Sequence, residues 1–283
     1  MFEFASEFLP MTDATKFQFT DASVPKAYDE YLVPRLFEPW AKRLLDEVKL
    51  KSGEIVLDIA TGPGTVARLA AARIGSQGHV FAIDLSKPML DVARAKPALA
   101  RAARIEYLQS QAAPLPGSSD IFDAVFCHQG MQFFPNRLAA LREMHRVLKP
   151  NGRAAIAVWA ELERNQIFAA YHTALRATVP EELASLMAAP FSWPDGEALQ
   201  HLAEEAGFRQ VRLVTPAMRM TLEGGVEQAI RAFSATPVSP RVAALSEEVQ
   251  KAFFARVRHE MSALQVDGKI VGEMVANIII AEP

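Results

Sequence analysis

The sequence predicts an α/β fold built on a parallel sheet with helices on both faces. Two observations support this prediction. Up to about residue 160, short β-branched runs alternate with segments in which apolar residues recur at the helical period. In addition, Gly62, Pro63 and Gly64 directly follow the first such run, and glycine turns of this kind join strands to helices in doubly wound sheets.

Five segments in this part of the chain have the pattern of buried strands. They are residues 55–59, 80–83, 105–108, 121–127 and 154–159. A helix over residues 41–50 precedes them, and helices are expected after the first, second and fourth strands. Ser86 and Pro88 are start signals for the second of these helices, whereas Asn151 and Gly152 end the last one.

After residue 160 the alternation weakens, which indicates inserted helices. Residues 166–187 are expected to form a helix, and Asp195 is expected to cap another that ends before Gly207. Residues 211–220 and 274–281 are expected to be late strands, with a polar helical stretch between them. We therefore predict a single domain with a core and two helical insertions. The domain spans residues 1–283, its core 41–160, and the insertions 161–208 and 223–268.

Composition and charge narrow the functional classes. Half of the 283 residues are hydrophobic and 22% are charged, as expected of a globular chain with a sizeable core. The formal net charge is −3 and the sequence has no basic run, so we expect no nucleic-acid partner. Cys127 is the only cysteine and the six histidines are scattered, so we predict neither a disulfide nor a metal site.

Hydropathy along the chain indicates neither export nor membrane insertion. Residues 1–11 are partly apolar but carry Glu3 and Glu7 and lack a basic region, so they do not fit a signal peptide. No stretch reaches the roughly 18 consecutive apolar residues of a membrane span. These features lead us to expect a cytoplasmic protein without a membrane span.

The glycine turn and the acid after the second strand indicate a nucleoside-containing cofactor. Asp84 follows Gly64 by 20 positions, where an acid can accept both hydroxyls of a ribose. Residues 62–67 also satisfy the dinucleotide fingerprint, so NAD is the alternative cofactor. Asp58 in the first strand counts against NAD, because its charge would repel a pyrophosphate, whereas an ammonium group would suit it.

Four ordered blocks of residues carry a family pattern. They are Leu57-Asp58-Ile59-Ala60-Thr61-Gly62-Pro63-Gly64, Asp84-Leu85-Ser86 with Met89-Leu90, Leu115-Pro116 before Phe122-Asp123-Ala124-Val125, and Arg146-Val147-Leu148-Lys149-Pro150-Asn151-Gly152-Arg153. Together they resemble the class I S-adenosylmethionine-dependent methyltransferases of the kind that includes the ubiquinone/menaquinone methyltransferases. The resemblance implies a Rossmann-like, doubly wound sheet of seven strands, the seventh antiparallel, with helical lid insertions. It also implies that S-adenosylmethionine is the cofactor.

The resemblance further implies a role for each matching residue. Gly62 and Gly64 would lie against the methionine half of the cofactor, Asp58 would bind its amino group, and Asp84 would hold the ribose. The other implied cofactor residues are Leu85 and Met89 on the adenine faces, Gln111 and the backbone of Ala112 at the adenine edge, and Tyr28 in a covering N-terminal segment. Two positions depart from the family. Ala60 replaces the usual first glycine of the loop, and Gln111 replaces a usual aspartate.

The end of the fourth strand is where we expect substrate and methyl group to meet, because ligands bind at the carboxyl ends of parallel strands. His128 is the candidate general base, since its unperturbed pKa of about 6.5 suits proton removal at neutral pH. His128 could instead contact the cofactor or pack against Phe133. Gln129 and Gln132 are expected to orient ligands, with Gln129 also counted among the cofactor residues, and Cys127 is expected to be core.

The sequence therefore predicts methyl transfer from S-adenosylmethionine to an oxygen, carbon or nitrogen of a small molecule. The insertions are rich in aromatic and large apolar side chains, which suits a hydrophobic or aromatic acceptor. Two alternatives stay open. One is an NAD-linked oxidoreductase, and the other is a protein that binds S-adenosylmethionine without transferring its methyl group.

Overall fold

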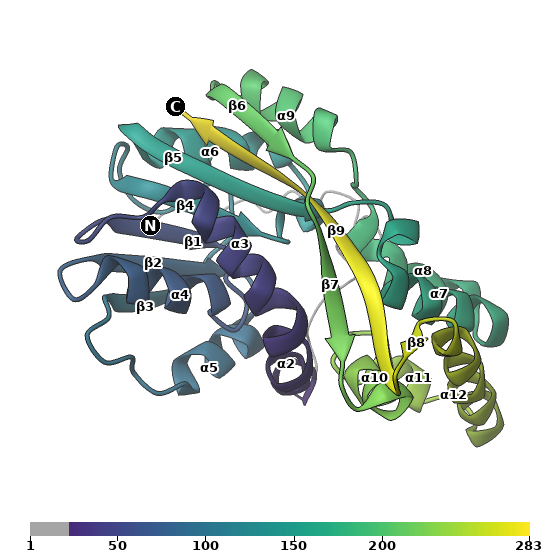
Figure 1. The fold of residues 1–283 in the computed structure, drawn as a ribbon. Coiled ribbons are helices and arrows are strands. Elements are labelled where there is room, and N and C mark those ends of the chain that lie inside the picture. Colours follow the sequence, from purple (N-terminus) through teal and green to yellow (C-terminus); the bar gives the residue numbers. More distant parts are fainter. Residues whose placement is uncertain (1–22) are drawn as a thin grey trace, which may run out of the picture.

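The computed structural model describes residues 23–283, which form a nine-stranded sheet with helices packed on it (Figure 1). Residues 1–11, in which the sequence was tested for a signal peptide, lie outside the described part of the chain. The strands are β1 (Ile55–Ile59), β2 (His79–Asp84), β3 (Arg104–Gln109), β4 (Phe122–His128), β5 (Leu148–Trp159), β6 (Arg209–Val214), β7 (Ala217–Leu222), β8 (Gln265–Val266) and β9 (Lys269–Glu282).

The strand order confirms the predicted doubly wound sheet. Neighbouring strands follow the order β3-β2-β1-β4-β5-β9-β6, so seven strands form the main path. The first five of these are parallel, whereas β9 runs antiparallel to both β5 and β6. Two short strands, β7 and β8, pair with another part of β9 and raise the total above the seven predicted. The order reverses between β1 and β4, and ligands bind beside such a reversal in open α/β sheets.

The central strands are buried on both faces, which explains why they appear in the sequence as continuous apolar runs. On β5, Ala155 and Ala157 join one core cluster, while Ile156 between them joins the other. The sheet helices are α3 (Glu38–Val48), α4 (Thr65–Ile74), α5 (Lys87–Ala95), α6 (Arg137–Val147) and α9 (Gly196–Glu205). Helices α3 and α4 cover the first face, and α6 and α9 pack on the second.

A second group of helices surrounds the far end of β9 (Figure 1). Strand β9 has 14 residues and continues past β5, so that its first half pairs with β7 and β8. The helices gathered there are α7 (Gln166–Thr178), α8 (Glu181–Ala188), α10 (Gly225–Phe233), α11 (Ser239–Ala243) and α12 (Glu247–Ser262). Aromatic rings of Tyr171, Phe233 and Phe253 join α7, α10 and α12 into one layer. We call these five helices the lid.

The lid corresponds to the predicted insertions with one difference. Helix α9 was included in the first insertion, yet it packs on the sheet beside α6 because Leu199 and Ala203 belong to the core on that face. No helix between residues 23 and 283 combines the length and apolarity that a membrane crossing requires. The domain boundaries themselves remain a prediction.

Prolines divide two elements that were predicted to be continuous. Residues 166–187 form α7 and α8, because Val179 is extended before Pro180, and the residue before a proline disfavours the helical conformation. The expected strand over 211–220 is interrupted at Pro216, which has no N–H for the sheet ladder. The segments on either side become β6 and β7, and they pair with different halves of β9.

The helix signals at Ser86, Asp195 and Gly207 are confirmed. The predicted end of α6 at Asn151 and Gly152 is wrong, because α6 ends at Val147 and Leu148 already pairs with Phe122 of β4, so both residues lie within β5. Ser86 Oγ accepts from Met89 N at 3.4 Å at the start of α5, and Asp195 Oδ1 accepts from Ala198 N at 2.9 Å at the start of α9. Gly207 lies just past α9 with φ of +109°, in the left-handed region that favours glycine.

The first described helices bring an N-terminal segment over the sheet. Helix α2 (Ser23–Ala27) continues into a π-helix, η1 (Tyr28–Phe37), which contains Pro34. Because Pro34 has no N–H, the turn before it lacks a donor. Arg35 Nη1 supplies donors there, to the carbonyls of Glu30 and Tyr31 at 3.0 Å each. Three short 3₁₀ helices complete the fold, η2 (Met131–Phe133), η3 (Leu162–Arg164) and η4 (Ala189–Phe191).

Candidate functional site

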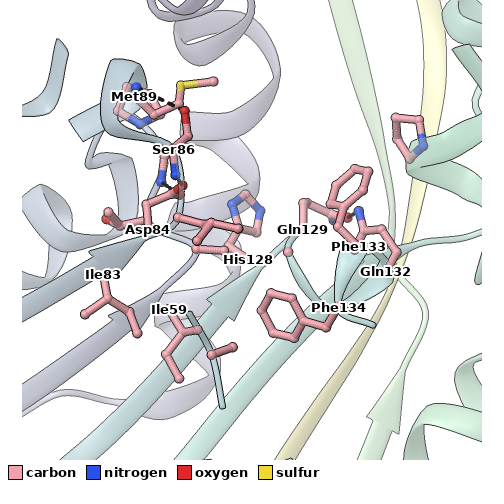
Figure 2. A pocket seen from close by; sticks show the side chains of 18 of the residues that line it. Ile59, Ile83, Asp84, Ser86, Met89, His128, Gln129, Gln132, Phe133 and Phe134 are labelled. Carbon is pink, nitrogen blue, oxygen red and sulfur yellow. Dashed lines mark hydrogen bonds between the residues drawn. The ribbon is translucent and has the colours of Figure 1, made fainter. Parts of the chain in front are cut away.

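A cavity of about 730 Å³ lies at the carboxyl ends of β1, β2 and β4 and reaches the lid (Figure 2). It brings together nearly all the residues predicted for the site. Those that line it are Tyr28, Asp58, Ala60, Gly62, Asp84, Leu85, Met89, Gln111, Ala112, His128 and Gln129. Gly64 is the exception. A Cβ atom there would lie 2.7 Å from the Tyr107 hydroxyl, so Gly64 packs against β3 at the start of α4 instead of facing the cavity.

The loop after β1 has an unusual backbone. Ala60, Gly62 and Gly64 all lie in the left-handed region, with φ of +57°, +54° and +82°. Glycine adopts this conformation without cost, whereas an alanine is strained by about 1 kcal/mol or more. Ala60 therefore keeps the backbone that a glycine would have. The sequence showed that Ala60 replaces a glycine but not that it stays left-handed.

Asp58 is the last residue but one of β1, just before this loop, and is buried, with 1% of its surface exposed. Its Oδ2 accepts from Thr61 Oγ1 at 2.5 Å and from Ala67 N at 2.9 Å. Its Oδ1 is buried and has no hydrogen-bond partner among residues 23–283. Burial raises the pKa of Asp58 to about 7, although the bonds from Thr61 and Ala67 oppose this shift. An ammonium group at Oδ1 would stabilise the ionised form.

Asp84 ends β2 on the opposite side of the loop. Its Oδ2 accepts from Gly62 N at 2.8 Å and its Oδ1 accepts from Ser86 N at 2.8 Å, so the carboxylate holds the β1 loop against the start of α5. Each carboxylate oxygen can accept a further hydrogen bond. Burial raises the pKa of Asp84, and the three backbone bonds from Ser86, Gly62 and Leu85 oppose this.

An apolar slot adjoins Asp84. Leu85 is 66% exposed, which is unusual for a leucine, while Met89 across the slot is buried. A flat ring placed between them would cover the exposed leucine. Gln109 Nε2 donates to the Leu85 carbonyl at 3.0 Å and fixes this turn. Gln111 and Ala112, from the segment after β3, line the same end of the cavity.

The end of β4 forms the middle of the cavity. In Figure 2, His128 lies between Asp84 on one side and Gln129 and Gln132 on the other. The His128 ring contacts Phe37 edge-on, with centroids 6.2 Å apart, and its Nε2 is buried without a partner in the described structure. Burial lowers the pKa of His128 to about 3, so the ring is neutral at pH 7.

The N-terminal segment contributes Tyr28 to the wall of the cavity. The Tyr28 ring stacks on Phe37 with centroids 4.6 Å apart, and both rings line the cavity. Lys96 fastens the segment to the β1 loop, because its Nζ donates to Asp29 Oδ1 at 2.5 Å and to the Pro63 carbonyl at 2.7 Å.

Several lining residues were not identified from the sequence. Trp159 ends β5, and its place at the carboxyl end of a parallel strand could have marked it. Residues 235–237, after α10, also line the cavity; they fall within the predicted insertion 223–268, but no sequence signal singled them out. Within the described structure, no group of three or more His, Cys, Asp or Glu side chains is arranged to hold a metal ion.

Comparison with known proteins identifies the family. The model of the ubiE/COQ5 methyltransferase family matches residues 19–217. The chain belongs to this family. A demethylmenaquinone methyltransferase from Staphylococcus aureus is 30% identical over 204 residues, which are 68% of this chain and 84% of that protein.

Solved structures agree with this assignment. A SAM dependent methyltransferase from Aquifex aeolicus is 28% identical, covers 69% of this chain and 92% of its own, and has a TM-score of 0.52. The Haemonchus contortus phosphoethanolamine N-methyltransferase 2, solved with S-adenosyl-L-methionine, has a TM-score of 0.61 at 18% identity over 96% of this chain. This chain spans 60% of that protein's length, and the likeness concerns the fold.

The predictions of fold, family and enzyme class are therefore confirmed. The chain is a class I methyltransferase with S-adenosylmethionine as its cofactor. Neither alternative from the sequence, an NAD-linked oxidoreductase or a binding protein without transferase activity, agrees with this family.

Proposed function

We propose that the cavity binds S-adenosylmethionine along the ends of β1 and β2 and places an acceptor beneath the lid for methylation at oxygen, carbon or nitrogen. The observation that carries this proposal is the pair of acids, Asp58 buried and Asp84 partly buried, on either side of a left-handed loop. Asp58 has one oxygen without a partner. Each Asp84 oxygen accepts one backbone hydrogen bond and can accept another. An ammonium group and a ribose diol supply the donors that these two carboxylates lack.

The residues present fit this cofactor along its length. Gly62 exposes its backbone to the cavity, and an added Cβ there would meet no atom within 4 Å, so the loop leaves open space for the methionine part. Asp84 would hold the ribose, and Leu85 and Met89 would cover the two faces of the adenine. Gln111 and Ala112 would contact the adenine edge, and Tyr28 would cover the cofactor.

The protein's contribution to the reaction is alignment and exclusion of water. S-adenosylmethionine supplies a methyl group on a positively charged sulfur. The acceptor must approach that carbon in line, and holding it there supplies several kcal/mol. Phe37, Trp159 and Phe191 line the cavity as neighbouring rings. Phe37 meets Trp159 edge-on with centroids 6.2 Å apart, and Trp159 is tilted against Phe191 at 6.4 Å. Their rings keep bulk water from the acceptor.

The acceptor that suits this cavity is small and hydrophobic. The end beneath the lid is lined by Trp159, Phe168, Met187 and Phe191. The related Staphylococcus aureus protein is named as a demethylmenaquinone methyltransferase, and that name denotes a quinone. A cytoplasmic location and the absence of a nucleic-acid partner remain predictions from the sequence.

We expect His128 to act as a general base for acceptors that arrive protonated. Its neutral ring has a lone pair available at pH 7, but the low pKa makes it a weak base. His128→Ala should therefore lower kcat by about 10²-fold, the low end for this kind of catalysis. S-adenosylhomocysteine affinity should stay within about threefold of the wild type, a change below 1 kcal/mol. Full turnover by the variant from pH 6 to 8 would exclude the role.

Asp84 offers a separate test of the ribose position. Asp84→Ala should weaken binding of S-adenosylhomocysteine by roughly 1 to 3 kcal/mol, because a charge-assisted acceptor is lost. Methylthioadenosine keeps the ribose and lacks the amino-acid tail, so its binding should weaken by the same factor. Calorimetric titration measures both ligands. Unchanged affinity in a variant that melts as the wild type does would contradict the ribose role.

The function itself is tested by product analysis. The full chain is incubated with S-adenosylmethionine and a panel of phenols, quinols, enols and amines, and mass spectrometry follows S-adenosylhomocysteine and methylated products. We expect both products to appear together for hydrophobic aromatic acceptors. A chain that binds NAD⁺ in calorimetry and yields no S-adenosylhomocysteine with any acceptor would refute the proposal.

A further inference from the structure

Two buried glutamine side chains lie at the end of β4, and each has one amide atom without a partner. Gln129 is 8% exposed and Gln132, in η2, is 1% exposed. Gln132 Nε2 donates to Gln129 Oε1 at 3.5 Å. This leaves Gln129 Nε2 and Gln132 Oε1 buried and unpartnered within residues 23–283. Exchanging oxygen and nitrogen in both amides leaves the same outcome, namely one free N–H donor and one free C=O acceptor.

The backbone on both sides holds this glutamine pair in place. Gln129 is left-handed, with φ of +58°, and its N donates to the Ala157 carbonyl on β5 at 2.9 Å. Arg137 Nη2 donates to the Gln132 carbonyl at 3.0 Å, and the Arg137 guanidinium lies 4.5 Å over the Trp193 ring. A buried amide atom without a partner costs about 1 to 3 kcal/mol, so a pair of them facing a cavity indicates a ligand that completes the bonds.

The cavity wall around the glutamine pair is uncharged. Among the described residues that line the cavity, Asp58, Asp84 and Lys87 are the acidic and basic ones, and they lie in β1, at the end of β2 and at the start of α5. The pair is instead flanked by Phe133 and Phe134 (Figure 2). The Arg137 guanidinium, which bonds the Gln132 carbonyl, is not part of this wall and is itself a cation, so an ammonium group placed here would be buried without a counter-charge.

We infer that Gln132, positioned by Gln129, determines acceptor specificity by binding a neutral hydroxyl group. A hydroxyl is both donor and acceptor, so it can donate to Gln132 Oε1 and accept from Gln129 Nε2. A carboxylate or an ether oxygen can only accept, and an ammonium can only donate, so each would satisfy one of the two atoms. The inference rests on the proposed function, because it assigns this end of the cavity to the acceptor.

The test uses three related probes on the full chain saturated with S-adenosylhomocysteine. They are 1-naphthol, its ether 1-methoxynaphthalene, and 1-naphthyl phosphate, with affinities from calorimetry. We expect the wild type to bind 1-naphthol at least about fivefold more tightly than either of the others, the ratio for one hydrogen bond of about 1 kcal/mol. Gln132→Leu should weaken binding of 1-naphthol but not of 1-methoxynaphthalene. The ratio of the two affinities should therefore fall below about twofold.

The control variant is Gln109→Leu. Gln109 also lines the cavity, but its Nε2 is already bonded to the Leu85 carbonyl, so the 1-naphthol preference should persist. Equal binding of the probes by the wild type would overturn the inference without any variant, as would a preference that survives Gln132→Leu. If the wild type fails to bind S-adenosylhomocysteine, the proposed function fails, and the probe preference of the unliganded chain still decides the role of Gln132.

Discussion

Asp58→Asn should weaken binding of S-adenosylhomocysteine by about 10²-fold, or near 3 kcal/mol, while leaving methylthioadenosine unaffected. The carboxylate is buried, its Oδ1 is unpartnered, and an ammonium group in that place forms a charge-assisted bond that an amide cannot replace. Methylthioadenosine has no ammonium group and therefore serves as the matched control ligand. Calorimetry gives both constants, and equal losses for the two ligands would contradict the assignment.

The same substitution should change the pH dependence of binding. Because the pKa of Asp58 is about 7 in the unliganded protein, an ammonium ligand must displace a proton at lower pH. Wild-type affinity for S-adenosylhomocysteine should therefore rise from about pH 5.5 and level off above about pH 7.5, with proton release. The affinity of Asp58→Asn should be flat over this range. A flat wild-type profile would show that Asp58 does not titrate.

The folding stability of the unliganded protein should fall with rising pH, opposite to the affinity for the ligand. A carboxyl group whose pKa is raised on folding stabilises the protein below its unfolded pKa and loses that stability as the pH rises through the folded value. For Asp58 this loss falls between about pH 4 and pH 7. At pH 8, unliganded Asp58→Asn should therefore have a free energy of unfolding that is a few kcal/mol higher than that of the wild type. This difference should shrink toward pH 4.

Gly130→Ala should destabilise the protein by about 2 to 3 kcal/mol. An added Cβ at Gly130 would lie 2.5 Å from Ala60 Cβ and 3.1 Å from Cys127 Sγ, both on fixed strand ends. Ala60→Gly in the same chain removes the first contact and also relieves the left-handed alanine, so the double variant should regain most of the loss. Urea denaturation measures all three variants.

The control for this prediction is Gly224→Ala. Gly224 has a negative φ, and an added Cβ there would lie 3.1 Å from Gln228 Cβ, a much milder contact than the one at Gly130, so the change should stay below about 1 kcal/mol. If the changes in unfolding free energy of Ala60→Gly and Gly130→Ala simply add in the double variant, the Ala60–Gly130 contact is not the cause of the destabilisation.

The core of the fold was predictable because its strands are buried on both faces and its turns carry glycine and Ser86 as local signals. The division of the chain at Pro180 and Pro216 was also present in the sequence, as prolines inside apolar stretches. The packing of α9 on the sheet could not be predicted from the sequence. Its apolar residues have a helical period that shows a buried face but not which surface buries it.

The candidate site was predictable to the extent that strand ends mark it. Asp84 and His128 end β2 and β4, and Asp58 is the last residue but one of β1, so their meeting in one cavity follows from a parallel sheet. Backbone strain at Ala60 and Gln129 and the unpartnered amides of Gln129 and Gln132 arise from three-dimensional packing, to which no sequence pattern corresponds.

The most direct measurement is a crystal structure of the full chain with S-adenosylhomocysteine. We predict that the ribose hydroxyls lie within hydrogen-bonding distance of the Asp84 carboxylate and that the ammonium group reaches Asp58 Oδ1, directly or through one water. The adenine should lie between Leu85 and Met89. A ligand bound outside this cavity, or with its amino-acid tail at Leu85, would contradict the account.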